Sequence, residues 1–170
     1  MRGKYWLPFF FCLALTACPY GAPVPLDAPE AGKIDQRLLG RWVQVHEKEV
    51  GFAEIEFFAF NGHEYLVEMR SREPYKPDDV SRYRAFSSEA GGKTFLNCRD
   101  LSEKESYDLA VYEFPAPEAV AFSFVNDDAM KPAGEVKSSK ALRRFVTAHL
   151  ADKGFFEPGF TFKKAEPARK

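Results

Sequence analysis

The sequence predicts a mostly β protein: a single antiparallel up-and-down barrel of about eight strands, with one late amphipathic helix near 139–152. Short runs rich in β-branched and aromatic residues recur between turn signals, and apolar and polar residues alternate within several of them. The chain has 170 residues, which suits one domain, and its 17 phenylalanines can fill a core. Closing the sheet into a barrel removes the exposed edges that an open sheet of this size would have.

Eight segments have strand character. The expected strands cover residues 41–47, 52–60, 63–71, 80–87, 93–98, 106–114, 119–125 and 155–163. Asn61-Gly62 predicts a two-residue hairpin turn, because both central positions of a type I′ turn need positive φ. Gly91-Gly92 marks another turn, and residues 72–80 are expected to form a longer loop.

Helical spacing occurs late in the chain. The apolar stripe consists of Leu142, Phe145, Val146, His149 and Leu150, and Ser138 or Ser139 can cap the helix. A membrane-surface helix is the alternative, but so short a helix beside a barrel is expected to pack on it. The 52–60 strand is apolar on both faces apart from Glu54 and Glu56, which suggests that this helix covers it. A short helical turn is expected around Ile34–Leu39.

The first 17 residues have the layout of a signal peptide. Arg2 and Lys4 form a positive start, residues 6–14 are almost purely apolar, and small residues follow. The apolar run is shorter than the roughly 20 residues of a membrane-spanning helix. A buried core segment is the alternative, but the proline-rich stretch that follows fits export better.

Leu15-Thr16-Ala17-Cys18 resembles the lipobox of bacterial lipoproteins. The resemblance implies cleavage before Cys18, a diacylglyceryl thioether on its sulfur and a fatty acyl chain such as palmitate on its amine. Several acyl chains would make membrane attachment stable, which one chain does not. Residue 19 is proline rather than aspartate, and by the resemblance this implies the outer membrane, with the domain facing the periplasm.

The predicted organisation is a signal peptide (1–17), a proline-rich tether (18–33), a β-barrel domain (34–163) and a charged tail (164–170). As extended chain, the tether would hold the domain roughly 40 Å from the lipid. An ordered arm packed on the domain is the alternative. Cys98 is the cysteine left over after processing and lipidation, so we expect it to be buried and without a disulfide.

Gly40-Arg41-Trp42 resembles the Gly-x-Trp start of lipocalins. The resemblance implies a ligand cavity above a tryptophan that closes one end of the barrel. The expected interior ligand-binding residues are Trp42, Tyr65, Val67, Met69, Tyr107, Leu109 and Phe122. Two family features are missing, a later Thr-Asp-Tyr element and a disulfide pair, so Trp42 can equally be an ordinary core residue.

Two functions stay open. The first is a barrel that binds a small apolar or amphipathic molecule, for which a hollow interior would be the sign. The second is a protein-interaction lipoprotein, such as an envelope assembly factor or an inhibitor of a wall-degrading enzyme, acting through the 72–80 loop. An enzyme is not expected, because no acid, base and nucleophile come together in a known motif. The net charge of −1, with no basic stripe, argues against nucleic acid, and three scattered histidines argue against a metal or cofactor site.

Overall fold

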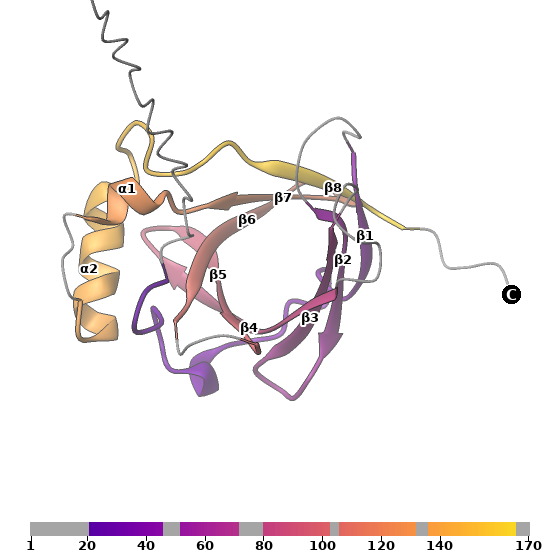
Figure 1. Ribbon diagram of the computed structural model, residues 1–170, viewed down its shortest axis with the longest axis horizontal. Helices are drawn as coiled ribbons and strands as arrows, with labels where there is room; N and C mark the ends of the chain where they lie inside the picture. The colour runs from indigo at the N-terminus through magenta and orange to yellow at the C-terminus, as the bar shows by residue number, and fades with distance from the viewer. Residues whose placement is uncertain (1–20, 46–51, 72–79, 103–105, 132–135, 166–170) are drawn as a thin grey trace, which may run out of the picture.

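The computed structural model describes residues 21–45, 52–71, 80–102, 106–131 and 136–165. They contain a closed barrel in which each strand pairs antiparallel with the next and β8 pairs back with β1 (Figure 1). The strands are β1 (Gly40–Gln44), β2 (Phe52–Ala59), β3 (Tyr65–Ser71), β4 (Val80–Ala90), β5 (Lys93–Asp100), β6 (Asp108–Ala116), β7 (Ala119–Phe124) and β8 (Phe160–Lys164). The predicted fold class is confirmed, and closure leaves no free strand edge.

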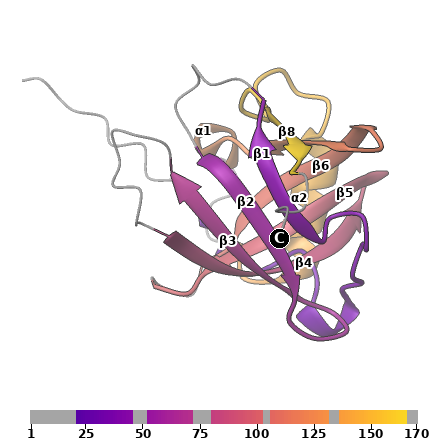
Figure 2. The same ribbon diagram turned by 90° about the vertical axis from the view of Figure 1, so that its right-hand side faces the viewer.

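The barrel has two distinct ends. At one end of the barrel, the odd-numbered strands finish and the even-numbered strands start. We call this the mouth end. The turns that join β2 to β3, β4 to β5 and β6 to β7 lie at the opposite end, which we call the closed end. Figure 2 shows strands β1 to β4 side by side along one wall of the barrel.

Side chains fill the middle of the barrel. One buried cluster gathers the inward side chains of all eight strands, including Trp42, Phe57, Val67 and Phe122. The rings of Phe57 and Phe122 stack with centroids 6.0 Å apart. The void at this level is only about 10 Å³, room for no more than one water molecule. The barrel is therefore not hollow along its length.

A second layer covers part of the outer wall. Helix α2 (Ser139–His149) lies beside the barrel, and its buried Leu142 and Val146 join a cluster with the outward-facing Phe95 and Val111 (Figure 1). This confirms the amphipathic helix and its packing on the barrel. The helix covers β4, β5 and β6 and not β2, where Phe58 is 40% exposed, so the expected cover for the 52–60 strand is wrong.

The segment before β1 is an arm packed on the barrel, not a free tether. Ala22 exchanges two backbone hydrogen bonds with Tyr107, both of 2.8 Å. Leu26 is 1% exposed, and the short 3-10 helix η1 (Pro29–Ala31) follows it. From Gly21 onward the tether prediction is therefore wrong: the prolines keep the arm from forming a long helix or strand, but its apolar residues are buried against the wall of the barrel. Residues 18–20 lie outside the described residues.

The β4–β5 turn forms as predicted, but the β2–β3 turn does not. Gly91 and Gly92 have φ of +58° and +76°, the pair of positive values that a type I′ hairpin needs. The predicted two-residue turn at Asn61-Gly62 is wrong. There the Asn61 side chain accepts hydrogen bonds from the N–H groups of His63 and Glu64, at 2.7 and 2.8 Å, and holds a longer turn without positive φ.

Several other elements begin or end at residues that differ from those predicted. Of the expected 155–163 strand, residues before Phe160 are irregular, although Phe156 forms one isolated bridge with Val125. The helical turn expected near Ile34–Leu39 is a hydrogen-bonded turn, and a four-residue helix, α1 (Asp127–Met130), follows β7 without having been predicted. The 72–80 loop lies outside the described residues except for Val80, as does the 166–170 part of the charged tail.

Candidate functional site

A pocket of about 230 Å³ opens at the mouth end of the barrel. We call this pocket the mouth; its lining residues are Met69, Tyr83, Cys98, Asp108, Leu109, Phe124, Val125, Asp127, Glu157 and Phe160. Six strands or their flanking residues contribute, so closure of the barrel is what brings these side chains together. The small central void shares Met69, Cys98, Phe124 and Phe160 with the mouth, which makes it the deepest part of the same space.

The mouth has an apolar floor and an acidic rim. Met69 and Cys98 are 5% and 3% exposed, and the phenyl rings of Phe124 and Phe160 stand beside them. The carboxylates of Asp108, Asp127 and Glu157 also line the pocket, and no lysine or arginine does. An apolar surface bordered by a few polar groups is the usual composition of a small-molecule site.

The floor stays uncharged at physiological pH. Burial, together with the neighbouring carboxylates of Asp100 and Asp108, raises the pKa of Tyr83 to about 12. Burial also raises the pKa of the Cys98 thiol far above its ordinary value, with Asp108 adding to the effect. A thiol that remains protonated is a poor nucleophile, so Cys98 has the character of a small apolar residue here. The expectation that Cys98 is buried and unpaired is confirmed.

The residues expected to bind ligand are separated by the structure. Trp42, Tyr65, Val67 and Phe122 are packed in the filled core, and Met69 reaches both the core and the mouth. Tyr107 and Leu109 do not face the interior. Leu109 belongs to the outer cluster beneath α2, although it borders the mouth, and the Tyr107 ring lies 6.2 Å from that of Phe86, another residue outside the interior cluster.

The face of β6 was misjudged for a physical reason. Its register with β5 sets Ala110 opposite Leu96 of the core, so Asp108, Ala110 and Tyr112 face inward. Tyr107, Leu109 and Val111 are the more apolar set, but a second layer buries them from outside. Where both faces of a strand are buried, alternation alone does not tell which one faces the lumen.

Trp42 closes the end opposite the mouth. It is fully buried, its indole N–H donates to the carbonyl of Leu38 at 2.7 Å, and the Lys164 ammonium lies 5.1 Å from the ring centroid. Nearby, the hydroxyl of Tyr65 accepts a hydrogen bond of 2.5 Å from the N–H of Asp35. Polar contacts thus seal this end, while the apolar floor remains accessible from the other.

Comparisons with protein-family models, with curated proteins and with solved structures gave no match for this chain. Within the part of the chain that the structure describes, no helix is long and apolar enough to cross a membrane. The same residues contain no group of three or more His, Cys, Asp or Glu side chains placed to hold a metal ion.

Proposed function

We propose that this protein is a lipid-anchored protein of the bacterial cell envelope whose barrel binds part of a small amphipathic molecule in its mouth. The observation that supports it is an apolar floor, open at one end of an otherwise filled barrel and edged by carboxylates. A pocket of about 230 Å³ is smaller than the roughly 300–1,000 Å³ of whole drug-sized ligands. It therefore suits one apolar segment, with the rest of the ligand at the rim.

The rim selects the polar end of that molecule. The carboxylate oxygens of Asp108, Asp127 and Glu157 accept hydrogen bonds, which disfavours a fatty carboxylate and favours a neutral or cationic head group that donates them. The neutral Tyr83 and Cys98 add no charge below them. The ligand class that fits is an apolar chain or ring carrying an amine or an uncharged polar group.

Chain length would place the proposed anchor near this same mouth. A Cβ atom on Gly21 would overlap the side chain of Ser106, and Ala22 pairs with Tyr107, directly before the mouth residue Asp108. Cys18 is three residues before Gly21, a reach of roughly 10 Å at most. The mouth would thus lie close to the bilayer surface, where amphipathic molecules are concentrated, and not far out in the periplasm.

Displacement of a fluorescent probe tests the ligand class. The mature-length chain with Cys18→Ser would be loaded with the neutral probe N-phenyl-1-naphthylamine and titrated with decylamine or decanoate. We expect decylamine to displace the probe at about tenfold lower concentration, equivalent to about 1.4 kcal/mol. Equal displacement by the two compounds would contradict the role of the acidic rim.

Two tryptophan substitutions on one strand locate the site. Met69→Trp fills the mouth and should abolish probe binding, while Leu66→Trp, in the same strand at a position of the opposite face, should not. Circular dichroism would establish that both variants keep the barrel. Probe binding that survives Met69→Trp in a folded barrel would show that the ligand binds outside the mouth.

Fractionation tests the anchor. The wild-type chain should pellet with membranes in processed form and label with radioactive palmitate. Cys18→Ser should lose the label and the processed, membrane-bound form. A processed Cys18→Ser chain that still pelleted with membranes would exclude the thioether.

A protein-interaction role is the second candidate. Phe58 and Phe60 are 40% and 54% exposed at the closed end of β2, and the guanidinium of Arg84 stacks 3.8 Å above the Phe60 ring. Exposed aromatic residues beside arginine are typical of protein-binding surfaces. Crosslinking at position 58 in cells, compared with position 163 on β8, would favour this role if a protein were captured at the first position alone.

A further inference from the structure

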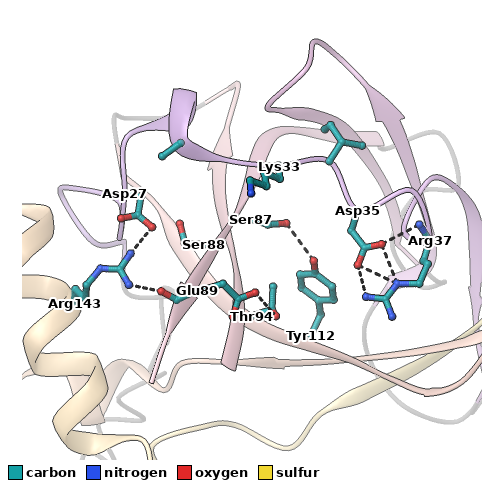
Figure 3. Close-up of a pocket in the computed structure, with 12 residues that line it drawn as sticks. Asp27, Lys33, Asp35, Arg37, Ser87, Ser88, Glu89, Thr94, Tyr112 and Arg143 are labelled. Atoms are coloured by element: carbon teal, nitrogen blue, oxygen red, sulfur yellow. Dashed lines mark hydrogen bonds and ion pairs between the residues drawn. The ribbon is translucent and has the colours of Figure 1, made fainter. Parts of the chain in front are cut away.

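A second hollow lies at the closed end of the barrel, between the arm, the β4–β5 hairpin and α2. Its volume is about 480 Å³, within the usual range for ligand sites, and it shares no residue with the mouth. Most of its lining residues have polar side chains, among them three cationic, three acidic and several hydroxyl groups. We call it the polar groove; Figure 3 shows its side chains converging from the arm on one side and from β4, β5 and α2 on the other.

Both walls of the groove are fixed in place. On the arm, the Nδ1 atom of His63 lies 2.9 Å from the Gly32 carbonyl oxygen, and Asp35 is tied to Tyr65. These contacts stand on either side of Lys33 and set the position of its backbone. On the hairpin, the guanidinium of Arg143 donates to the Glu89 carbonyl, and the Thr94 hydroxyl donates to the Glu89 carboxylate at 2.7 Å.

Ion pairs account for four of the six charged groups. The Arg37 guanidinium donates to both carboxylate oxygens of Asp35, with the shortest contacts at 2.9 and 2.6 Å, and this pairing lowers the pKa of that carboxyl. Arg143 pairs with Asp27. The remaining cation is Lys33 and the remaining anion is Glu89. Among the described residues neither has an ion-pair partner, and no ion pair joins them to each other.

The floor between these two charges carries hydroxyl groups. The Tyr112 hydroxyl lies 3.2 Å from the Ser87 hydroxyl, at the polar tip of a ring that otherwise belongs to the core. Burial raises the pKa of Tyr112, so the phenol stays protonated and can both donate and accept. Figure 3 shows Lys33 and Glu89 on opposite sides of this hydroxyl pair. The groove thus presents a cation, neutral hydrogen-bonding groups and an anion in succession.

We infer that the polar groove binds a small zwitterion, an amino acid or short peptide, with its carboxylate at Lys33 and its ammonium at Glu89. Hydroxyls of Ser87 and Tyr112 would meet a peptide group between the two ends. A ligand carrying separated opposite charges complements both unpaired groups at once, whereas a simple anion or cation complements one and is repelled by the other. This site is independent of the ligand proposed for the mouth.

Calorimetric titration of the full mature chain in detergent micelles tests the inference, because short peptides do not partition into micelles. The probes are the dipeptide Ala-Ala, its N-acetyl form and its C-terminal amide. We expect the zwitterion to bind at least fivefold more tightly than either derivative. Lys33→Gln should erase the preference over the amide alone, and Glu89→Gln the preference over the acetylated form alone.

Lys163→Gln and Glu118→Gln serve as matched controls, since both residues are exposed and do not line the groove. They should leave all three affinities unchanged. Equal affinity of the three probes, no binding of any probe at 10 mM, or equal loss for every probe in the Lys33 and Glu89 variants would overturn the inference. Circular dichroism of each variant separates these results from misfolding.

Discussion

The buried side chain of Asn97 accepts a hydrogen bond of 2.8 Å from the backbone N–H of Leu26, 71 residues earlier in the chain. Its amide nitrogen donates to the carbonyl of Phe86, at 3.2 Å, and to the hydroxyl of Ser88, at 2.9 Å. One fully buried amide therefore joins the arm to β4 and β5. The arm is held by a specific polar contact as well as by apolar burial.

Asn97→Ala should detach the arm. The substitution leaves the buried Leu26 N–H without its partner, and one buried unsatisfied group costs about 1–3 kcal/mol. We expect urea denaturation to show a loss of this size, about 1–3 kcal/mol. Hydrogen exchange at the Ala22 and Leu26 amides should accelerate, while exchange at Val67 in β3 changes less. Unchanged protection of the arm would show that apolar contacts alone hold it.

Trp42→Phe should destabilise the closed end through one missing donor. The ring volume is largely kept, but the Leu38 carbonyl loses the 2.7 Å hydrogen bond from the indole. A cost of about 1–3 kcal/mol is expected, against about 3–5 kcal/mol for Trp42→Ala, which also leaves a cavity. Thermal unfolding followed by circular dichroism measures both. A Trp42→Phe variant as stable as the wild type would show that this hydrogen bond does not contribute to the free energy of unfolding.

The barrel was predictable because its signals are local. Gly91-Gly92, the alternation in 63–70 and the stripe from Leu142 to Leu150 each report a local period or turn, and each lies where the structure has a strand, turn or helix of that kind. The arm was not predictable from the same signals. Prolines disfavour long helices and strands, but whether the arm stays free in solvent or packs on the barrel depends on Asn97 and the outer wall, far away in sequence.

The site was predicted only in part, for a related reason. Met69 and Leu109 were expected to bind ligand and both line the mouth, but Tyr83, Phe124 and Phe160 were missed. These three residues lie toward the mouth end of their strands, and the level at which side chains stop filling a barrel depends on how rings such as Phe57 and Phe122 stack across it. No single strand contains that information. The aromatic repeat in Phe122 and Phe124 was the available sign.

Alkaline pH should destabilise the protein in two steps. The folded pKa values of Cys98 and Tyr83 are raised, so the folded chain holds protons that the unfolded chain releases. Their stabilising contribution is complete below the unfolded pKa, about 8.5 for cysteine and 10 for tyrosine, and is lost as pH rises above it. Each group adds a slope of up to about 1.4 kcal/mol per pH unit.

Cys98→Ala separates the two steps. The free energy of unfolding, measured in urea from pH 7 to 11, should begin to fall near pH 8.5 in the wild type and near pH 10 in the variant. The decrease in the free energy of unfolding above pH 10 should remain in the variant, because burial also raises the pKa of Tyr65 and of Tyr112. Identical pH profiles for the two chains would mean that the thiol is not desolvated in the folded state.

Gly91 and Gly92 offer a matched test of the β4–β5 hairpin, which forms one wall of the polar groove. Both have positive φ, so alanine at either position costs about 1 kcal/mol from backbone strain. A Cβ at Gly92 meets open space, whereas a Cβ at Gly91 would overlap the end of the Leu150 side chain. The half-buried Leu150 side chain must leave its present rotamer to make room, so Gly91→Ala should cost about 0.5–1.5 kcal/mol more than Gly92→Ala, measured by urea denaturation.

The excess should disappear when the opposing side chain is shortened. In the Leu150→Ala background, Gly91→Ala and Gly92→Ala should cost the same, because only the backbone term remains. Residues in direct contact show such non-additivity, and residues without shared partners do not. An excess cost that persisted without the Leu150 side chain would place the strain in the turn itself and not in its contact with the segment after α2.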